Sequence, residues 1–395
     1  MQVTIVGQGY VGLPVSMAIS ACGHKVVGID SNPFVVTNLN QGISHIEDVK
    51  NIQLRQAIMQ KSYFASSDLS YVEQSDVIVV CLPTPLLENK LPNLEILETA
   101  VAAIAKKIKP GIMIIIESTI QPGTTRNSLL PIIIRNSGLK IGDFDLAFSP
   151  ERIDPGNSTW NLSNTPKLVA GVTDRAGRRA MDFYSSFVNN IHYCDSVEIA
   201  ETAKLLENTF RLINISFINE LSMFCDEIKI DIASVIQAAS TKPYGFMAFY
   251  PSIGAGGHCI PVDPIYLSER AKAVNVSSRL IDTAIEINNE MPSYFLSKAE
   301  KKIGSMKDKK ILVIGIAYKA NVSDIRESPV ISLINLLREK GAKVLWHDDL
   351  VAKWNGESSV EIRVGYDLAI LAAHHDYIDL SGLGSTPILY TKNSL

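Results

Sequence analysis

The apolar and polar positions of the chain first form a series of short strands that alternate with helices. A strand over Val3–Val6 leads into a glycine-rich turn, a helical stretch ends at Cys22, and a second strand covers Lys25–Ile29. Further apolar runs lie at Val77–Leu82, Ile112–Glu117 and Asp145–Phe148. A helical segment, Leu94–Ile108, lies between the first two of them. This alternation predicts a parallel sheet covered by helices, in a first domain that closes near residue 195.

The pattern then changes to one long helical stretch, Val197–Ile230. Its apolar residues recur every three or four positions, at Ile199, Ala203, Leu206, Phe210, Ile213, Phe217 and Leu221. A helix of ~34 residues extends about 50 Å, which is too long for a single small domain. We therefore expect it to connect two domains and to supply the interface of a homodimer.

A third region repeats the strand–helix–strand order of the first. Ile311–Gly315 and Lys343–His347 are predicted strands, and Ser328–Lys340 is a predicted helix between them. The glycine pattern of the first region is replaced here by Gly315-Ile-Ala-Tyr-Lys319. The region is therefore expected to bind something other than a dinucleotide cofactor, and the nucleotide of a substrate is one candidate.

Together these regions predict an α/β chain of two Rossmann-like doubly wound domains joined by a long central helix. The expected domains are residues 1–195 for a cofactor, residues 196–300 for the long helix and a cysteine-bearing loop, and residues 301–395 for a second, shortened Rossmann-like domain.

Charge and composition narrow the class of protein. The chain has 37 basic and 41 acidic residues and no dense basic run, so it is not expected to bind nucleic acid. Its first residues lack the cationic start of a signal peptide, and no apolar run approaches the ~20 residues that span a bilayer. We expect a cytoplasmic protein without a membrane partner.

Five cysteines without CxxC spacing favour neither a disulfide framework nor a zinc site, so no metal is expected. Most of them are expected to be small buried residues. A cysteine with a chemical role instead requires surroundings that activate its thiol.

A cofactor fingerprint follows the first strand. The segment Gly7-Gln-Gly9-Tyr10-Val11-Gly12 opens a helix, and Asp30 ends the next strand. The glycines allow a tight turn and a close approach of the backbone to a pyrophosphate, and Asp30 is expected to accept hydrogen bonds from a ribose. Because Ser31-Asn32-Pro33 offers no arginine for a 2′-phosphate, NAD is favoured over NADP. A tight turn without ligand and an FAD site are the alternatives.

Two further loops follow predicted strands, at the edge where a doubly wound sheet binds ligands. Pro83 and Thr84 lie in the first and Thr119 in the second, which makes them candidates for the cofactor site. Ordinary turn and cap chemistry is the alternative for these residue types.

A lone cysteine, Cys259, follows a glycine-rich loop that begins at Ser252 and precedes Asp263 by four positions. Successive free N–H groups in such a loop favour an anion and lower a thiol pKa, and a thiolate is a nucleophile for carbonyl chemistry. A buried cysteine beside a turn is the competing interpretation. For the neighbouring His258, a structural role is favoured over that of a base.

The central helix carries Lys204 and Asn208 four positions apart, and therefore on one face. Asn is a poor former of helix interiors, so its position mid-helix indicates use. A solvated surface face is the alternative.

These residues belong to a larger set of motifs. They are Gly7–Gly12, Pro83-Thr84-Pro85, Glu117-Ser-Thr119, Ser149-Pro-Glu151-Arg152, Lys204-xxx-Asn208, Gly256-Gly-His-Cys259-xxx-Asp263 and the segment from Gly315 through Lys319 to Pro329. With them the chain resembles the UDP-glucose/UDP-N-acetylhexosamine 6-dehydrogenase family over almost its full length.

The resemblance implies a four-electron reaction in which a sugar C6 alcohol becomes an aldehyde, a thiohemiacetal and then a thioester on Cys259, which water hydrolyses. It implies that Lys204 and Asn208 hold the reacting oxygen, and that Asp263 assists proton transfer. Glu151 and Thr119 would position or activate the water.

The resemblance also implies contacts with a UDP-sugar substrate. The implied substrate residues, beyond those above, are Arg152, Arg211, Lys242, Tyr250, Gly256 and Lys319, and Arg326 would reach the cofactor side or the sugar nucleotide. Val262 stands where UDP-glucose enzymes carry a lysine, and the segments Ser149–Asn157 and Thr241–Pro251 look like the UDP-N-acetylglucosamine branch. UDP-N-acetylmannosamine and UDP-glucose remain alternatives.

Two other functions fit parts of the sequence. A two-electron β-hydroxyacid dehydrogenase shares the glycine fingerprint and a long helix with a catalytic lysine, but needs no cysteine. A non-catalytic NAD-binding protein would have no chemical use for Cys259, Lys204 and Asn208.

Overall fold

The computed structural model describes residues 1–154, 157 and 159–392. The chain divides into two compact units, Met1–Leu206 and Glu207–Leu395. The boundary falls inside the long helix, so the three-domain division expected from the sequence stays a prediction. Two residues of the Ser149–Asn157 motif, Pro155 and Gly156, lie outside the described residues.

The first unit is built on an eight-stranded sheet with the order β3-β2-β1-β4-β5-β6-β7-β8. The strands are β1 (Gln2–Val6), β2 (Lys25–Ile29), β3 (Tyr63–Ser66), β4 (Val77–Val80), β5 (Met113–Ile116), β6 (Asp145–Phe148), β7 (Lys167–Gly171) and β8 (Ile191–Tyr193). β4 and β5 are uninterrupted apolar runs because both of their faces are buried. All pairs are parallel except β6 with β7.

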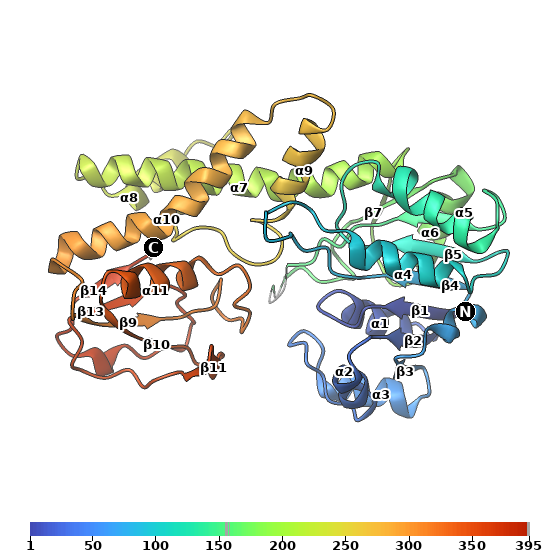
Figure 1. Cartoon of the computed structure of the whole chain (residues 1–395), viewed down its shortest axis with the longest axis horizontal. Coiled ribbons are helices and arrows are strands. Elements are labelled where there is room, and N and C mark those ends of the chain that lie inside the picture. The colour runs from blue at the N-terminus through green and yellow to red at the C-terminus, as the bar shows by residue number, and fades with distance from the viewer. Residues whose placement is uncertain (155–156, 158, 393–395) are drawn as a thin grey trace. The chain divides into compact units, whose positions relative to one another are not determined.

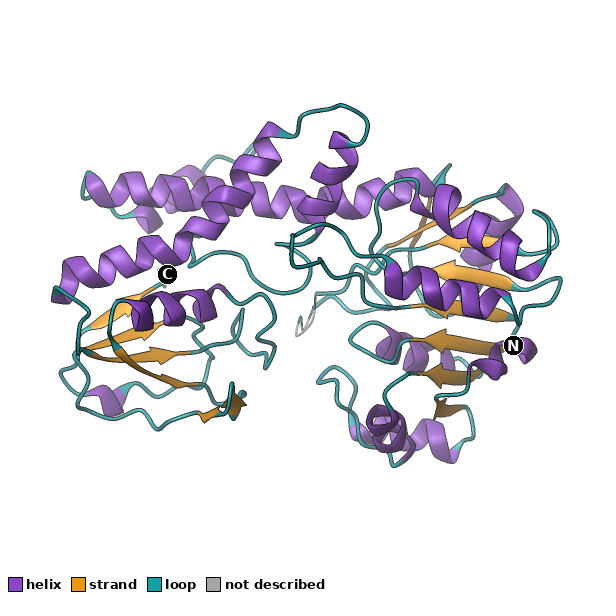
Figure 2. Cartoon of the chain, viewed as in Figure 1, coloured by secondary structure: helices purple, strands orange, loops and turns teal. Residues whose placement is uncertain are grey.

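Helices cover both faces of this sheet (Figures 1 and 2). They are α1 (Gly12–Ala21), α2 (Pro33–Asn40), α3 (Asn51–Met59), α4 (Glu95–Ala105), α5 (Leu130–Ser137) and α6 (Asp174–Tyr184). One apolar core contains buried residues of α4 and α5, and a second contains those of α1, α3 and α6. Two cores on opposite faces are what a doubly wound sheet requires.

The long helix α7 runs from Val197 to Glu227, which is 31 residues. It ends three residues before the predicted end, because Lys229 takes a left-handed conformation and Asp231 caps the next helix. The helices that follow are α8 (Ile232–Ser240), α9 (Asp263–Lys272) and α10 (Arg279–Ile303).

The second unit contains a parallel four-stranded sheet with the order β10-β9-β13-β14 (Figure 1). Its elements are β9 (Lys310–Ile314), α11 (Pro329–Glu339), β10 (Lys343–His347), β13 (Leu368–Leu371) and β14 (Ile388–Tyr390), with a small hairpin of β11 (Lys353–Trp354) and β12 (Glu357–Ser358). Buried residues of β9, α10 and α11 share one core. The predicted fold class, two Rossmann-like units joined by a long helix, is confirmed.

Some features differ from the sequence-based expectations. Cys194 and Cys225 are buried, but Cys22 is exposed like Cys259 and Cys81 is intermediate, so the expectation that most cysteines are buried was wrong. Short helical turns also occur at Leu69–Gln74, Thr125–Leu129 and Ser381–Leu383. Within the described ranges, no helix is both long and apolar enough to cross a membrane.

Candidate active site

The loop between β1 and α1 is shaped by its glycines. A Cβ on Gly7 would lie 2.4 Å from the Cys81 carbonyl oxygen, and one on Gly12 would lie 1.8 Å from the Gly7 carbonyl oxygen. A Cβ on Gly9 would meet nothing within 4 Å, so the backbone is open at that position. The tight turn and the open backbone fit a dinucleotide pyrophosphate at the start of α1, where Tyr10 is exposed and Val11 is half-buried.

Asp30 is held at the mouth of this loop. Its Oδ2 accepts the Gln8 N–H at 3.0 Å and its Oδ1 accepts the Asn32 N–H at 2.9 Å. Each carboxylate oxygen keeps a free lone pair for a ribose hydroxyl. Sequence reasoning missed the role of Gln8, whose buried Oε1 accepts hydrogen bonds from Ser16 and Tyr63 and braces the turn from below.

The loops after β4 and β5 are joined to each other. The Leu82 N–H donates to Ser118 Oγ at 3.0 Å, and Thr84 Oγ1 donates to the Thr119 carbonyl oxygen at 2.8 Å. Pro83 is exposed beside them. The Thr84 hydroxyl therefore braces the Thr119 loop, in addition to lying at the edge expected for the cofactor.

A buried carboxylate connects the Thr119 loop to the long helix. Glu201 of α7 accepts the Gly123 N–H at 2.6 Å and the Thr125 N–H at 2.9 Å. Burial raises the pKa of Glu201 to about 7. Nothing in its sequence context singled this residue out, because its partners lie far away along the chain.

The carboxyl ends of β5 and β6 carry a second buried group that the sequence did not reveal. Lys167 Nζ lies 3.2 Å from Glu117 Oε1 and 3.2 Å from Glu151 Oε2. Tyr184 donates its hydroxyl to Glu117. Arg152, the neighbour of Glu151, donates to the Pro166 carbonyl oxygen at 2.5 Å. Glu151 is thus part of an ion cluster rather than a free carboxylate.

In the second unit, the loop that carries Cys259 is fixed by two asparagines. Asn219 of α7 accepts the Ser252 N–H at 2.8 Å. Asn288 of α10 accepts the Ala255 N–H at 2.7 Å and donates to the Ala255 carbonyl oxygen at 3.2 Å. The loop is rigid on both sides, yet Cys259 itself is exposed.

Cys259 lies in the turn that leads into α9. Its carbonyl oxygen accepts the Val262 N–H at 3.2 Å and the Asp263 N–H at 2.8 Å. Asn208 Nδ2 donates to Asp263 Oδ2 at 2.5 Å, with both side chains buried. The structure thus brings together Cys259, Asp263 and Asn208, and Lys204 lies one helical turn before Asn208 with 8% of its surface exposed.

His258 is not suited to carry a proton beside the thiol at neutral pH. Burial, and after it the positive charge of Arg326, lowers the pKa of His258. The ring is therefore neutral at pH 7, and the structural role that the sequence favoured over that of a base stays a prediction.

The loop from Gly315 to Pro329 packs against the cysteine loop. The Gly257 N–H donates to the Arg326 carbonyl oxygen at 3.1 Å, and a Cβ on Gly257 would lie 2.9 Å from the Tyr318 ring. Gly256 is equally enclosed, since its Cβ would lie 2.8 Å from Tyr318, so neither position tolerates a side chain. The Arg326 guanidinium forms an ion pair with Asp324 at 2.6 Å.

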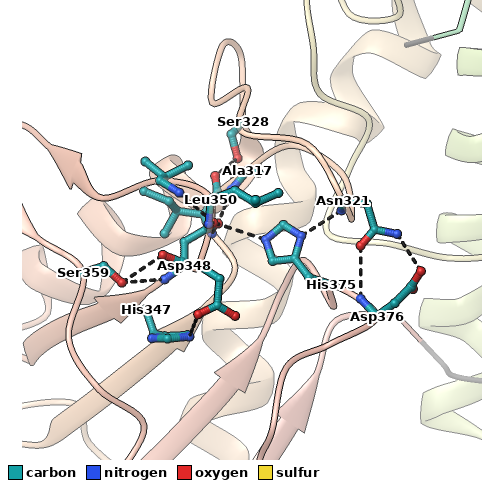
Figure 3. A network of polar contacts seen from close by, with 12 residues as sticks. Ala317, Asn321, Ser328, His347, Asp348, Leu350, Ser359, His375 and Asp376 are labelled. Atoms are coloured by element: carbon teal, nitrogen blue, oxygen red, sulfur yellow. Dashed lines mark hydrogen bonds and ion pairs between the residues drawn. The ribbon is translucent and has the colours of Figure 1, made fainter. Parts of the chain in front are cut away.

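Asp348 and His375 hold this loop from below (Figure 3). Asp348 Oδ2 accepts the N–H groups of Ile316 and Ala317 at 2.9 and 3.2 Å. His375 Nε2 lies 3.2 Å from Asp348 Oδ1, and His375 Nδ1 accepts the Asn321 N–H at 2.7 Å. Burial by itself works to raise the pKa of Asp348, but the hydrogen bonds, first of all that from His375, hold this pKa below its usual range.

The remaining predicted substrate residues lie on more open parts of the second unit. Arg211 is exposed on α7, and Lys242 is exposed after α8 with its ammonium 5.0 Å from the centre of the Tyr244 ring. Tyr250 is half-buried against the small apolar core of α7 and α8, and Lys319 is half-buried.

Comparisons with known proteins agree with this architecture along the whole chain. Sequence profiles of the UDP-glucose/GDP-mannose dehydrogenase family match residues 1–188 with its NAD binding domain, residues 198–290 with its central domain and residues 312–382 with its UDP binding domain. The chain belongs to the UDP-glucose/GDP-mannose dehydrogenase family. It is therefore an NAD-dependent oxidoreductase that acts on a nucleotide-linked sugar, as the resemblance noted from the sequence implied.

Named relatives in this family differ in their sugar. The chain is 33% identical to a UDP-N-acetyl-D-glucosamine 6-dehydrogenase of Pseudomonas aeruginosa, over 95% of this chain and 90% of that protein. It is 32% identical to a UDP-N-acetyl-D-mannosamine dehydrogenase of Pyrococcus horikoshii, again over 95% and 90%. The Pyrococcus horikoshii structure described as a UDP-D-ManNAc dehydrogenase has a TM-score of 0.91 at 30% identity and covers 100% of this chain and 96% of that one.

Proposed function

We propose that the protein oxidises the C6 hydroxyl of a UDP-N-acetylhexosamine, with UDP-N-acetylglucosamine favoured, to the uronic acid in a four-electron reaction. The observation that carries this proposal is an exposed Cys259 in a rigid loop, next to the buried Asn208–Asp263 pair. A mere alcohol dehydrogenase has no use for a nucleophile in this position, whereas retention of an aldehyde requires one.

The sugar alcohol loses a hydride and a proton and becomes an aldehyde. The Cys259 thiolate adds to the aldehyde carbon to form a thiohemiacetal, which loses a second hydride to become a thioester. NAD+, bound twice in succession by the first unit, would supply the acceptor for each of the two hydrides. Water then attacks the thioester, the carbon–sulfur bond breaks, Cys259 leaves as a thiolate, and the two protons of the water pass to solvent, which leaves the carboxylate.

Charge develops on the reacting oxygen, and the side chains around Cys259 suit that charge. Lys204 offers an ammonium and Asn208 an amide from one face of α7, and both are buried, where such interactions are strong. Asp263 accepts a proton relayed through water. In the first unit, Thr119 and Glu151 position the hydrolytic water.

The cofactor and substrate contacts follow the two units. The residues that bind NAD lie in the first unit and are Gly7, Gly9, Tyr10, Val11, Gly12, Asp30, Pro83, Thr84 and Thr119. The residues that contact the UDP-sugar are Arg152, Arg211, Lys242, Tyr250, Gly256 and Lys319. Arg326 reaches the cofactor side or the sugar nucleotide.

The acetamido sugar is supported by the absence of a lysine at Val262 and by relatives named for N-acetylglucosamine and N-acetylmannosamine. A panel of UDP-glucose, UDP-N-acetylglucosamine, UDP-N-acetylmannosamine and UDP-N-acetylgalactosamine, each mixed with NAD, tests this. We expect the highest kcat/KM with UDP-N-acetylglucosamine. A preference for UDP-glucose would overturn the sugar assignment and leave the mechanism intact.

Cys259→Ser tests the mechanism, and Cys22→Ser is the matched control because Cys22 is also exposed. We expect Cys259→Ser to form no uronic acid while it still binds NAD, and Cys22→Ser to keep normal activity. Full turnover by Cys259→Ser would refute the thioester route.

We also propose that α7 forms a homodimer interface. Leu206, Phe217 and Phe224 are 59%, 60% and 58% exposed, and their spacing aligns them on one side of the helix. Large apolar side chains in such a row are the kind of surface that a second copy of the same helix covers.

A further inference from the structure

The antiparallel pairing of β6 with β7 decides what lies opposite Glu151. Phe148 pairs with Ala170 in this ladder, and Ala147 pairs with Gly171. The same register, continued for three residues beyond Phe148, brings Glu151 opposite Lys167. The lysine at the start of β7 therefore meets the carboxylate that follows β6, at the carboxyl edge of the parallel strands.

The contacts of Lys167 are short and buried. Its ammonium lies 3.2 Å from each of Glu117 and Glu151, and the side chains of Lys167, Glu117 and Glu151 are 4%, 0% and 11% exposed. The ammonium also lies 4.9 Å from the centre of the Tyr184 ring. A buried cation with two carboxylate partners is held in one geometry.

The ammonium of the cluster is charged at neutral pH. Burial works to lower the pKa of Lys167, but Glu117 and Glu151 outweigh it and raise the pKa to about 12, so the ammonium stays charged. Burial raises the pKa of Glu117. Burial, and then Glu117, raises the pKa of Tyr184, which therefore remains a hydroxyl donor.

The carboxylate of Glu151 is almost fully occupied. Oε1 accepts the Arg152 N–H at 2.6 Å and the Ile153 N–H at 2.8 Å, and Oε2 accepts Lys167. A carboxylate has about four acceptor positions, so these three donors leave room for roughly one further donor. An O–H group of a single water fits that description.

We propose that Lys167 is a positioning residue for thioester hydrolysis, because it fixes Glu151 so that its remaining acceptor position orients the attacking water. The inference rests on the proposed function. In the hydrolysis, the water oxygen bonds to the thioester carbon and the carbon–sulfur bond breaks. Cys259 leaves as a thiolate, and both protons of the water pass to solvent. Lys167 acts through Glu151 and touches neither sugar nor cofactor.

The test separates positioning from simple charge balance. Lys167→Met alone leaves two carboxylates without their buried cation and is expected to destabilise the fold. Lys167→Met combined with Glu117→Gln removes one positive and one negative charge, so the net charge of the cluster equals that of the unaltered protein. Glu117→Gln alone is the matched control, and Lys167→Arg keeps a cation with several donors. Circular dichroism verifies that each variant is folded.

The measurement is a rapid-mixing experiment with NAD and the best UDP-sugar, followed by quenching and intact-protein mass spectrometry. For the double variant, we expect an initial burst of NADH, a steady rate at least about tenfold below that of Glu117→Gln, and sugar bound covalently to Cys259. Lys167→Arg is expected to recover part of the steady rate.

Two other results are decisive. If the double variant matches Glu117→Gln in steady rate and carries no bound sugar, Lys167 serves charge balance alone and the inference is overturned. If the unaltered protein forms a single NADH per sugar and Cys259→Ser is fully active, the proposed function fails, and the role of Lys167 fails with it.

Discussion

Buried carboxylates that accept backbone N–H groups recur in this protein, and Glu201 is one that lies on α7 itself, three positions before Lys204. It is completely buried, and it ties α7 to the loop that carries Thr119. Two N–H donors favour the charged form, but removal from water outweighs them, because burial raises the pKa of Glu201 to about 7.

This raised pKa predicts a specific pH dependence of stability. Folding takes up a proton at Glu201 between its ordinary pKa of 4.5 and about 7. The stabilising effect is therefore fully present below 4.5 and is lost as the pH rises through 7, by up to about 3 kcal/mol. Urea unfolding from pH 5 to pH 8 should show Glu201→Gln gaining stability relative to the unaltered protein as the pH rises.

Glu198→Gln is the control for this measurement. Burial works to raise the pKa of Glu198, but Arg126 and other donors hold it below its usual value. Its contribution is therefore constant from pH 5 to pH 8 and is lost only in more acidic solution. A stability difference for Glu201→Gln that does not change with pH would contradict the assignment of the raised pKa.

The sequence indicated which residues matter wherever spacing along the chain alone sets a contact. Lys204 and Asn208 share a face because they lie four apart on a helix, and Asp263 follows Cys259 by one turn. Lys167 could not be found in this way, because its partner is set by the register of an antiparallel pair in an otherwise parallel sheet. Glu201 was not found from the sequence either, because its hydrogen-bond partners lie more than seventy positions away along the chain.

At the scale of elements, the two Rossmann-like units use the same acidic position differently. Asp30 and Asp348 both follow the second strand of a βαβ unit. Asp30 accepts two N–H groups and keeps acceptor capacity, whereas Asp348 accepts those of Ile316, Ala317, Leu350 and Val351 together with His375. The acceptor positions of the Asp348 carboxylate are thus occupied by donors of the protein, several of them in the loop that replaces the glycine fingerprint.

His375→Phe tests whether this loop serves the UDP-sugar. Phenylalanine keeps an aromatic ring to stack on Tyr377 but loses both nitrogens, so Asn321 and Asp348 lose a partner (Figure 3). We expect the KM for the UDP-sugar to rise about tenfold, as for the loss of one or two positioning hydrogen bonds, with little change in the KM for NAD.

His347→Phe is the matched control. The His347 ring contacts Val360 and Asp349, and only its backbone carbonyl oxygen, which phenylalanine keeps, accepts the Gly315 N–H of the loop at 2.8 Å. Its replacement should therefore leave the KM for the UDP-sugar unchanged. Equal effects of both variants, or a His375 effect on the KM for NAD alone, would show that the loop has another role.

Most of the strands and helices that the sequence predicted lie within two residues of their observed bounds, because buried parallel strands are short and strongly apolar. Asp145–Phe148 and Lys343–His347 have the predicted bounds, and α11 begins one residue later than expected. Several elements were not predicted, among them β7 and β8. Their residues are less apolar, and β8 is only partly buried at the edge of the sheet, where the hydrophobic signal fades.

At the scale of the whole molecule, the proposed homodimer depends on the exposed row on α7. Phe217→Asp combined with Phe224→Asp would place two charges in the interface and should convert a dimer to a monomer in sedimentation experiments. Phe34→Asp on α2 is the control, because Phe34 is 73% exposed and lies elsewhere. A monomeric unaltered protein, or an unchanged mass of the double variant, would contradict the proposal.

The two-unit architecture by itself does not separate a four-electron from a two-electron dehydrogenase. A 3-hydroxyisobutyrate dehydrogenase of Mycobacterium tuberculosis shares the fold over 74% of this chain, with a TM-score of 0.54 at 14% identity. In the proposed function the cysteine loop makes the distinction, because Cys259 would supply the nucleophile that a four-electron route requires.

The most direct measurement is the yield of NADH from a limiting amount of the best UDP-sugar, with the product identified by mass spectrometry. The thioester route through Cys259 predicts two NADH and one uronic acid for each UDP-sugar consumed, with no free aldehyde. One NADH per sugar, with an aldehyde or ketone as the product, would contradict it.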